Sequence, residues 1–367
     1  MDATVQPIEG AQPEANRALP FSFTGSASEY FGIWIVNLLL SIVTLGIYTA
    51  WAKVRRLRYF YGNSWLDGHN FEYHARPVQI LIGRLIVFGA LIAVNILVNV
   101  VSPLFGLLFI PYLLAFPWLI NKSIAFNARM TSYRNVRLNF RGTYWGAFVA
   151  FIVAPLLGMF SLGFAVPVAS HISSNYIGQH LGYGTARFET DAPIGTLYRN
   201  LGMTILFMIG SMFVVVGAFT GIGFYIASFN TIGHTGSNQE LAKALEAAPV
   251  FISVIGGYVA LGITVLFYLA GVRNVAFNAT TLEGGHHFAS NVGRIRYTWI
   301  LISNLFATIL TIGLLRPWAS IRTWRYLANR TTLHAAGTLD GFVDTAAPQG
   351  NVAAAEFFDI EGIDFGL

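Results

Sequence analysis

The segment at residues 44–64, TLGIYTAWAKVRRLRYFYGNS, concentrates side chains that could bind an anion. Lys53, Arg55 and Arg58 stand there among aromatic residues, and Tyr59 follows Arg58 directly. Cationic groups beside aromatic rings suit contacts with anionic lipid headgroups, or with an anionic solute, at a membrane surface. The same residues would also serve as ordinary positively charged anchors on the cytoplasmic side, so both interpretations stay open.

The chain contains this segment three times. The second copy, SLGFAVPVASHISSNYIGQHL, starts at Ser161, and the third, TIGLLRPWASIRTWRYLANRT, starts at Thr311. Aligned without gaps, the first and third copies share basic and aromatic positions, which pair Arg55 with Arg322, Arg58 with Arg325 and Tyr59 with Tyr326. All three copies share a glycine after an apolar run, namely Gly46, Gly163 and Gly313. Because glycine interrupts helices and permits turns, we expect a helix break at each of these positions.

Two asparagines occupy one column of this alignment, within the apolar helices that precede the glycines. They are Asn37 and Asn304. A polar side chain at membrane depth needs a hydrogen-bonding partner or water. An interhelical hydrogen bond would stabilise helix packing by about 0.6–2 kcal/mol, whereas a row of such groups could line a hydrated solute path. The sequence leaves both interpretations open.

Other kinds of chemistry have little support in the sequence. The chain has no cysteine, which excludes disulfides and thiolate sites, and its eight histidines match no established metal-ligand spacing such as H-E-x-x-H. It has no phosphate-binding Walker loop and no G-x-S-x-G nucleophile motif. We therefore expect no enzyme, no metal and no cofactor.

The elements that carry these residues must belong to a membrane protein. Of the 367 residues, 55% are hydrophobic and 11% are charged, against roughly 25% charged residues in soluble domains. Several apolar runs reach the ~20 residues that a bilayer core requires. The net charge of +5 therefore indicates a cytoplasmic face and contacts with anionic lipids, and not binding of nucleic acid.

The pattern predicts an all-α polytopic membrane protein with short flanking β-strands. Each of three internal repeats has an apolar helix, a glycine break and a basic amphipathic helix, and the first two repeats are followed by a long transmembrane hairpin. The predicted organisation is a disordered lead at 1–19, repeat units with hairpins at 20–137 and 138–287, a third unit without a hairpin at 288–342, and an acidic tail at 343–367.

The positive charges bear on the topology in the membrane. Seven full crossings would place 16 of the 22 Lys and Arg residues on the cytoplasmic side. If each repeat helix instead enters and leaves from the cytoplasm, only the two hairpin tips face outward, and those tips carry Lys243 alone, which leaves 21 basic residues inside. The positive-inside rule favours this second arrangement, with both termini cytoplasmic, whereas apolar runs of about 20 residues usually span a bilayer. Both topologies stay open.

The opening strand FSFTG, Asn37 in an apolar helix and the run from Thr44 to Tyr73 resemble the YjgN-like family of bacterial inner-membrane proteins. That family is defined by a domain of unknown function, so the resemblance implies a multi-span body in the bacterial inner membrane and no particular activity. Two hypotheses for function remain. The protein could move or gate a small solute, or it could be a structural or lipid-interacting protein whose partners are membrane lipids with anionic headgroups.

Overall fold

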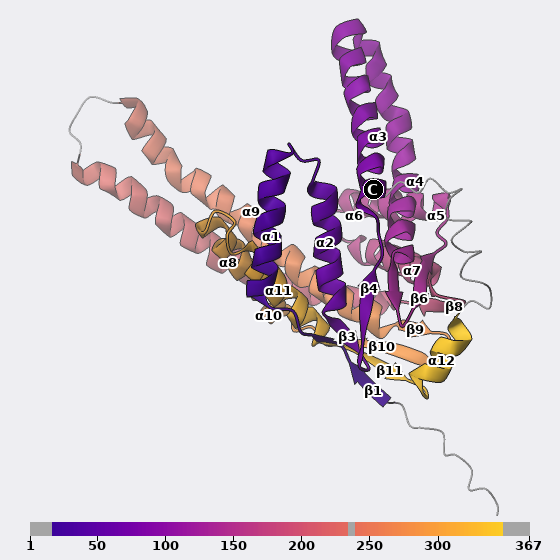
Figure 1. The fold of residues 1–367 in the computed structure, drawn as a ribbon. Coiled ribbons are helices and arrows are strands. Elements are labelled where there is room, and N and C mark those ends of the chain that lie inside the picture. Colours follow the sequence, from indigo (N-terminus) through magenta and orange to yellow (C-terminus); the bar gives the residue numbers. More distant parts are fainter. Residues whose placement is uncertain (1–16, 234–238, 348–367) are drawn as a thin grey trace, which may run out of the picture.

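Short β-strands alternate with helical hairpins along the chain in the computed structural model (Figure 1). The structure describes residues 17–233 and 239–347. The predicted disorder at residues 1–16 and the acidic end from residue 348 onward lie outside the described residues. The end of the predicted disordered lead, residues 17–19, instead belongs to the first strand, β1 (Arg17–Pro20).

Eleven strands in the described residues form one antiparallel sheet, in the order β1-β11-β10-β9-β8-β7-β6-β5-β4-β3-β2. The strands after β1 are β2 (Ser22–Phe23), β3 (Ser64–Leu66), β4 (His69–Tyr73), β5 (Thr131–Tyr133), β6 (Val136–Phe140), β7 (Leu181–Tyr183), β8 (Ala186–Thr190), β9 (Thr280–Leu282), β10 (His286–Ser290) and β11 (Thr331–Ala335). The two ends of the sheet, β1 and β2, are separated in the chain only by Phe21, whose N–H donates to the Thr331 carbonyl at 3.0 Å. The sheet is therefore a nearly closed barrel, and closure removes most of the free strand edge.

This sheet overturns the prediction of an all-α protein with short flanking strands. Each strand has only two to five residues, too few for an alternating pattern to stand out from the surrounding loops. Several pairings also join residues separated by a whole helical hairpin, as Phe71 with Tyr133. A segment such as Ser64–Leu66 becomes a strand through partners that no local pattern reveals, because strand formation depends strongly on tertiary context.

In the part of the chain that the structure describes, five helical hairpins connect the strands. The three shorter hairpins are α1 (Ala27–Val43) with α2 (Thr49–Gly62), the run of α5 (Tyr144–Phe148), η3 (Val149–Val153) and α6 (Ala154–Phe160) with α7 (Val166–His180), and α10 (Arg294–Leu310) with α11 (Arg316–Ala328). The two longer hairpins are α3 (Pro77–Ile96) and η1 (Leu97–Val101) with η2 (Pro103–Leu108) and α4 (Phe109–Arg129), and α8 (Ile194–Gly233) with α9 (Gln239–Asn278). A last helix, α12 (Leu339–Ala346), follows β11.

The order of the elements places all five helical hairpins at one end of the barrel. Each hairpin follows an even-numbered strand and leads into the next odd-numbered strand, and the sheet is antiparallel throughout. The opposite end of the barrel carries the tight turns, such as Asp67-Gly68 and Arg134-Asn135, which have positive φ angles. Below, these are called the helix end and the turn end. Helix α12 lies at the turn end, away from the hairpins (Figure 1).

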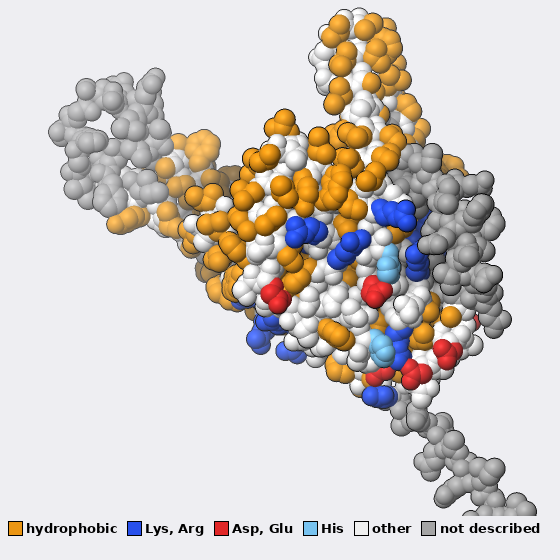
Figure 2. Space-filling view, viewed as in Figure 1, with side chains coloured by type: hydrophobic (Ala, Val, Ile, Leu, Met, Phe, Trp, Pro, Cys, Tyr) orange, Lys and Arg blue, Asp and Glu red, His pale blue; other side chains and the backbone are white. Residues whose placement is uncertain are grey.

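Within residues 17–233 and 239–347, four helices are long and apolar enough to cross a membrane, and they form the two longer hairpins. These are Pro77–Val101, Leu104–Arg129, Ile194–Tyr225 and Ala247–Asn278. Hydrophobic side chains cover the projecting helices in Figure 2, whereas the acidic and histidine side chains of that face gather over the barrel. The two longer hairpins are therefore the candidate transmembrane spans.

The tips of the three shorter hairpins are apolar and almost fully exposed. Leu45, Leu162 and Ile312 are 94%, 90% and 95% exposed, and each adopts a positive φ directly before the glycine. Gly46, Gly163 and Gly313 have φ angles of +92°, +93° and +91°. Helix α1 has 17 residues, or about 25 Å, which is shorter than a hydrocarbon core of about 30 Å. Such tips suit hairpins that enter the bilayer and return.

Candidate functional site

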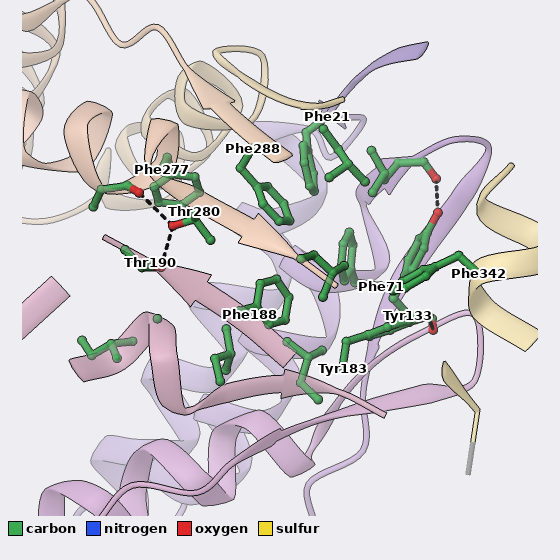
Figure 3. Close-up of a pocket in the computed structure, with 18 of the residues that line it drawn as sticks. Phe21, Phe71, Tyr133, Tyr183, Phe188, Thr190, Phe277, Thr280, Phe288 and Phe342 are labelled. Carbon is green, nitrogen blue, oxygen red and sulfur yellow. Dashed lines mark hydrogen bonds between the residues drawn. The ribbon is translucent and has the colours of Figure 1, made fainter. Parts of the chain in front are cut away.

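The barrel encloses an apolar cavity of about 460 Å³. Phe21, Phe71, Phe188 and Phe288 point into it from different parts of the barrel wall (Figure 3). At the helix end its wall includes Ile177 of α7 and Ala276 and Phe277 of α9, and at the turn end it includes Leu339, Phe342 and Val343 of α12. The cavity therefore runs through the barrel from one end to the other.

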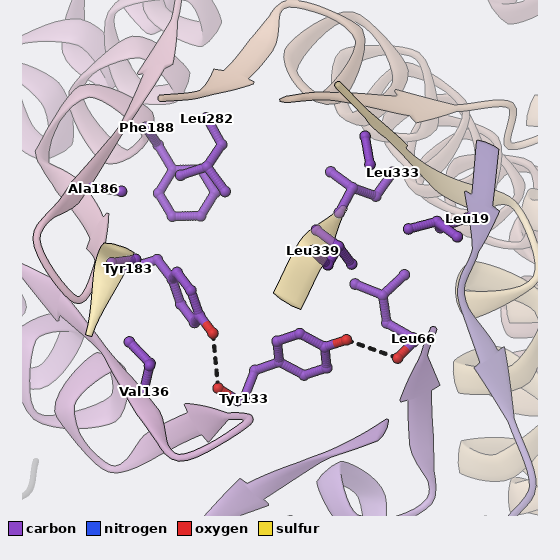
Figure 4. Packing of buried hydrophobic residues seen from close by; sticks show 12 residues of the cluster. Leu19, Leu66, Tyr133, Val136, Tyr183, Ala186, Phe188, Leu282, Leu333 and Leu339 are labelled. Atoms are coloured by element: carbon purple, nitrogen blue, oxygen red, sulfur yellow. Dashed lines mark hydrogen bonds between the residues drawn. The ribbon is translucent and has the colours of Figure 1, made fainter. Parts of the chain in front are cut away.

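The hydrophobic core of the barrel surrounds this cavity. Its residues come from both halves of the chain (Figure 4) and include Leu19, Leu66, Tyr133, Val136, Tyr183, Ala186, Phe188, Leu282, Leu333 and Leu339. Strand residues alternate between the two faces of a sheet, so most inward positions are apolar while the outward ones carry polar groups such as His287 and Glu189. Burial of these side chains stabilises the barrel and leaves an interior without charge.

Two tyrosines in the wall use their hydroxyls on the protein itself. The Tyr183 hydroxyl donates to the Tyr133 carbonyl at 2.9 Å, and the Tyr133 hydroxyl donates to the Leu66 carbonyl at 2.8 Å. Burial raises the pKa of Tyr133 to about 12 and raises that of Tyr183 as well. Both phenols are therefore neutral at physiological pH and offer no ionised oxygen to a ligand.

Helix α12 closes the turn end of the cavity. The Phe342 ring stacks on Tyr183 at 6.1 Å and meets the His286 ring edge-on at 4.4 Å. The Thr185 N–H donates to the Ala346 carbonyl at 2.9 Å, and Arg134 forms an ion pair with Asp340.

His286 beneath this helix is neutral at physiological pH. It is 1% exposed, and burial lowers the pKa of its imidazole. Its Nδ1 accepts from the Ala336 N–H at 3.2 Å, which places the remaining proton on Nε2. The closed end of the cavity is thus uncharged as well.

The helix end of the cavity holds its few polar groups. The Thr280 hydroxyl donates to the Ala276 carbonyl at 2.8 Å and accepts from the Thr190 hydroxyl at 2.8 Å. Ser174 of α7 also lines this end, and its hydroxyl has no hydrogen-bond partner among the described residues. Ile177, which lines the same end, is 38% exposed. An apolar ligand with one polar end could place that end beside Ser174.

The asparagine in the third short hairpin binds within its own hairpin. Asn304 is 6% exposed, and its amide donates to the Ala319 carbonyl at 3.1 Å and to Thr323 Oγ1 at 2.9 Å. Arg322 donates to Asn304 Oδ1 at 3.1 Å and to Ser303 Oγ at 2.7 Å. These bonds tie α10 to α11.

The first short hairpin has the corresponding contact in a weaker form. Arg55 donates to Asn37 Oδ1 at 3.4 Å. Neither Asn37 nor Asn304 lines the barrel cavity.

The remaining predicted contact residues fasten the short helices to the barrel. Arg58 donates to the Tyr73 and Ala75 carbonyls, both at 3.2 Å, and Arg325 donates to the Gly25 carbonyl at 2.7 Å. The Tyr59 hydroxyl donates to the Ser26 carbonyl at 2.9 Å, and the Tyr326 hydroxyl donates to the Gly293 carbonyl at 3.3 Å. Lys53 lies half-buried on α2. Of the predicted residues, the structure therefore pairs Asn37 with Arg55 and Asn304 with Arg322, while the other arginines and the tyrosines bind backbone carbonyls.

One cluster in the barrel has the residue types of a hydrolytic triad. His74 Nε2 lies 2.7 Å from Ser132 Oγ and 3.3 Å from Glu72 Oε2. In a catalytic triad the base contacts the nucleophile through one ring nitrogen and the carboxylate through the other. Here Ser132 and Glu72 both lie closest to Nε2 of His74, so the cluster does not have the geometry of a catalytic triad.

A family model described as a bacterial protein of unknown function, DUF898, matches residues 18–360. The chain belongs to the DUF898 family. The inner membrane protein YjgN of Salmonella typhimurium is 27% identical over 358 residues, which cover 87% of this chain and 88% of that protein. The inner membrane protein YjgN of Escherichia coli strain K12 is 23% identical over 317 residues, which cover 76% of each chain. No solved structure matches.

These matches confirm the resemblance to the YjgN-like family. The relatives are named inner membrane proteins, and the four apolar helices of this DUF898 protein agree with a place in a membrane. The family description assigns no activity, so the function must be argued from the geometry.

The cavity residues of this DUF898 protein were missed by sequence reasoning. A signal did exist, because Phe71, Phe188 and Phe288 each occupy an inward position on an even-numbered strand. The pattern Phe-Glu at residues 71–72 and 188–189 indicates strands. It does not indicate that the three rings face one enclosed space, because that depends on closure of the sheet.

Proposed function

We propose that this protein binds one apolar chain, such as the acyl chain of a lipid, inside its barrel at the surface of the inner membrane. The observation that carries the proposal is the apolar cavity of about 460 Å³ inside the barrel. Small-ligand pockets have volumes of about 300–1,000 Å³, and small β-barrels commonly hold one ligand in their interior.

The chemistry of the wall favours hydrocarbon over a polar solute. Six phenylalanines line the cavity, and the hydroxyls of Tyr133 and Tyr183 donate to backbone carbonyls. A polar solute would lose its hydration there without regaining hydrogen bonds, which costs several kcal/mol by the usual estimate of ~2–7 per polar group. An acyl chain instead gains about 0.8 kcal/mol for each buried CH₂ group.

The position of the cavity gives such a chain a route from the bilayer. All helical hairpins in the described residues leave from the helix end, where Ser174, Ile177 and Ala276 form the wall. The turn end is covered by α12. A chain that enters from the helix end would leave its polar group near Ser174 and place its tail towards Phe342.

Photocrosslinking can test this proposal directly. The probe is a palmitate with a diazirine in the middle of its chain, added to the full-length protein in nanodiscs. Lipids around the helices will label the exposed faces of α3 and α8 in any case. Adducts on the barrel strands, at Phe188 or Phe288, are expected only if the chain occupies the cavity. Labelling confined to the helices would reject the proposal.

A pair of alanine variants supplies the matched control. Ala276→Phe adds a ring to the cavity wall, whereas Ala289→Phe adds the same ring on the outward face of β10, next to the inward-facing Phe288. We expect Ala276→Phe to abolish the strand adducts and Ala289→Phe to leave them unchanged. Equal loss in both variants would mean that the adducts report general damage to the barrel.

A further inference from the structure

A second pocket, of about 320 Å³, lies where α8, α9 and α10 meet the helix end of the barrel. Its wall includes Pro193, Thr196, Arg199, Asn274, Asn278 and Arg294. Ala276 and Phe277, which lie between its α9 residues in the chain, face the barrel cavity instead. The two pockets therefore lie on opposite faces of the C-terminal part of α9.

This pocket contains two arginines and no acidic residue in its wall. The Arg294 guanidinium lies 5.7 Å from the centre of the Phe267 ring, and its Nη1 lies 3.6 Å from Met203 Sδ. Among the described residues neither Arg199 nor Arg294 donates a hydrogen bond to an oxygen atom. A guanidinium group has five N–H donors, so both side chains retain most of their capacity to bind an anion.

Other arginines near the barrel use their donors on the protein itself. Arg273 directly precedes the pocket residue Asn274 on α9. It donates to Ser290 Oγ at 2.5 Å and to Thr331 Oγ1 at 2.8 Å. Arg322 and Arg325 likewise donate to oxygen atoms of the protein. The fold supplies oxygen acceptors to those arginines, two of which the sequence singled out, whereas no oxygen of the described residues accepts a bond from Arg199 or Arg294.

Two helix N-termini and the side-chain amide of Asn278 also lie at this pocket. Helix α8 starts at Ile194, after Pro193, and α10 starts at Arg294, so both N-termini are at its wall. Helix N-termini carry partial positive charge. The Asn278 side chain accepts from the Ser290 N–H through Oδ1 at 2.6 Å, and its amide group has no acceptor among the described residues.

We infer that Arg199 and Arg294 form a binding site for a phosphate group, and that the phosphate belongs to an anionic phospholipid. Bidentate guanidinium contacts fit phosphate oxygens well. The surroundings favour a lipid as the source, because Tyr198, Ile295 and Trp299 next to the pocket are 43%, 70% and 63% exposed. Exposed apolar side chains beside a phosphate site would lie against the acyl chains of the same lipid.

Lipid retention by the full-length protein can test this site, and the result does not depend on the barrel cavity. The protein is reconstituted in vesicles of equal parts phosphatidylglycerol and phosphatidylcholine, extracted in mild detergent and measured by native mass spectrometry. The variants are Arg199→Gln, Arg294→Gln and the double variant. Arg187→Gln is the control, because Arg187 is exposed on β8 and the change removes the same charge.

The double variant should retain much less phosphatidylglycerol relative to phosphatidylcholine. From the roughly 1 kcal/mol that each basic residue gains near an anionic surface, we expect a loss of about fivefold for one arginine and about 25-fold for both. Arg187→Gln should leave the ratio unchanged. An equal ratio in the wild type and the double variant would overturn the site.

Delipidated protein titrated with inorganic phosphate separates the two sources of the ligand. We expect inorganic phosphate to raise the melting temperature far less than phosphatidylglycerol does, because it lacks the acyl chains. Stabilisation by inorganic phosphate that equals the lipid's, and that the double variant loses, would overturn the lipid assignment in favour of a free phosphate.

Discussion

The hydrogen bonds of Asn304 make a quantitative prediction about the short hairpins. Replacing Asn304 by Leu removes two donated bonds and the acceptor for Arg322. The Ala319 carbonyl keeps its bond from Thr323, and Arg322 keeps its bond to Ser303. We therefore expect the free energy of unfolding to fall by about 2 kcal/mol, within the range for buried hydrogen-bonding groups. The larger loss that follows when a buried charge is left without any hydrogen bond is not expected, because Arg322 keeps its bond to Ser303.

A double-mutant cycle isolates the contact between Asn304 and Arg322. The variants are Asn304→Leu, Arg322→Met and both together, since Met keeps much of the apolar stem. Interhelical hydrogen bonds in membrane proteins average about 0.6 kcal/mol and reach about 1.7. The 3.1 Å bond to a charged group in a site only 6% exposed belongs near the upper end, so we expect a coupling energy of about 1–1.5 kcal/mol.

The corresponding pair in the first hairpin is the internal control. Arg55 reaches Asn37 at 3.4 Å through a single bond, so the same cycle there should give a coupling of about 0.5 kcal/mol or less. Reversible unfolding in mixed micelles, followed by tryptophan fluorescence, measures both cycles. Coupling near zero for Asn304 and Arg322, or equal coupling in the two hairpins, would refute the reasoning that bond length and number set these energies.

Three further predictions concern the hairpin tips, the barrel wall and the topology. Gly313→Ala should destabilise the protein by about 1–2 kcal/mol. Backbone strain is the only cause, since φ is +91° and an added Cβ meets nothing within 4 Å. The control Gly106→Ala, in η2 and without a positive φ, should leave the free energy of unfolding nearly unchanged. Unfolding free energy should fall as pH rises from about 10 to about 12, because the folded protein keeps the Tyr133 proton that the unfolded chain releases, and Tyr133→Phe should lessen that slope. Cysteines introduced at Asn135 in a barrel turn and at Ser102 in a hairpin tip should react with impermeant reagents from opposite sides of the membrane; reaction from one side would show that the α3–α4 hairpin does not span.

The sequence predicts the helices well because their signals are local. The apolar helices expected before Gly46 and Gly313 are Ala27–Val43 and Arg294–Leu310 in the structure. Hydrophobic runs and the glycines that follow them are sufficient to place these boundaries. Membrane insertion depends mainly on the length and composition of the apolar runs, so the sequence is sufficient to predict it as well.

The barrel and the partners of the basic residues could not be predicted in this way. Arg58 and Arg325 have the right type for a headgroup contact, yet their acceptors are backbone carbonyls of Tyr73, Ala75 and Gly25. Those carbonyls become available only where the strand ends meet the helices. Likewise, the positions of Arg199 and Arg294 in the sequence, 95 residues apart, give no indication that α8 and α10 bring them to one pocket.

The connectivity of the barrel restricts the topology more firmly than charge counting does. Every helical hairpin in the described residues leaves from the helix end and returns to it, so we expect the barrel to lie on one side of the membrane whatever the depth of each hairpin. The excess of Lys and Arg outside the long hairpin tips then favours a cytoplasmic barrel. With that orientation the helix end faces the inner leaflet. Both proposed lipid contacts, the acyl chain beside Ser174 and the phosphate at Arg294, would therefore draw on lipids of the same leaflet.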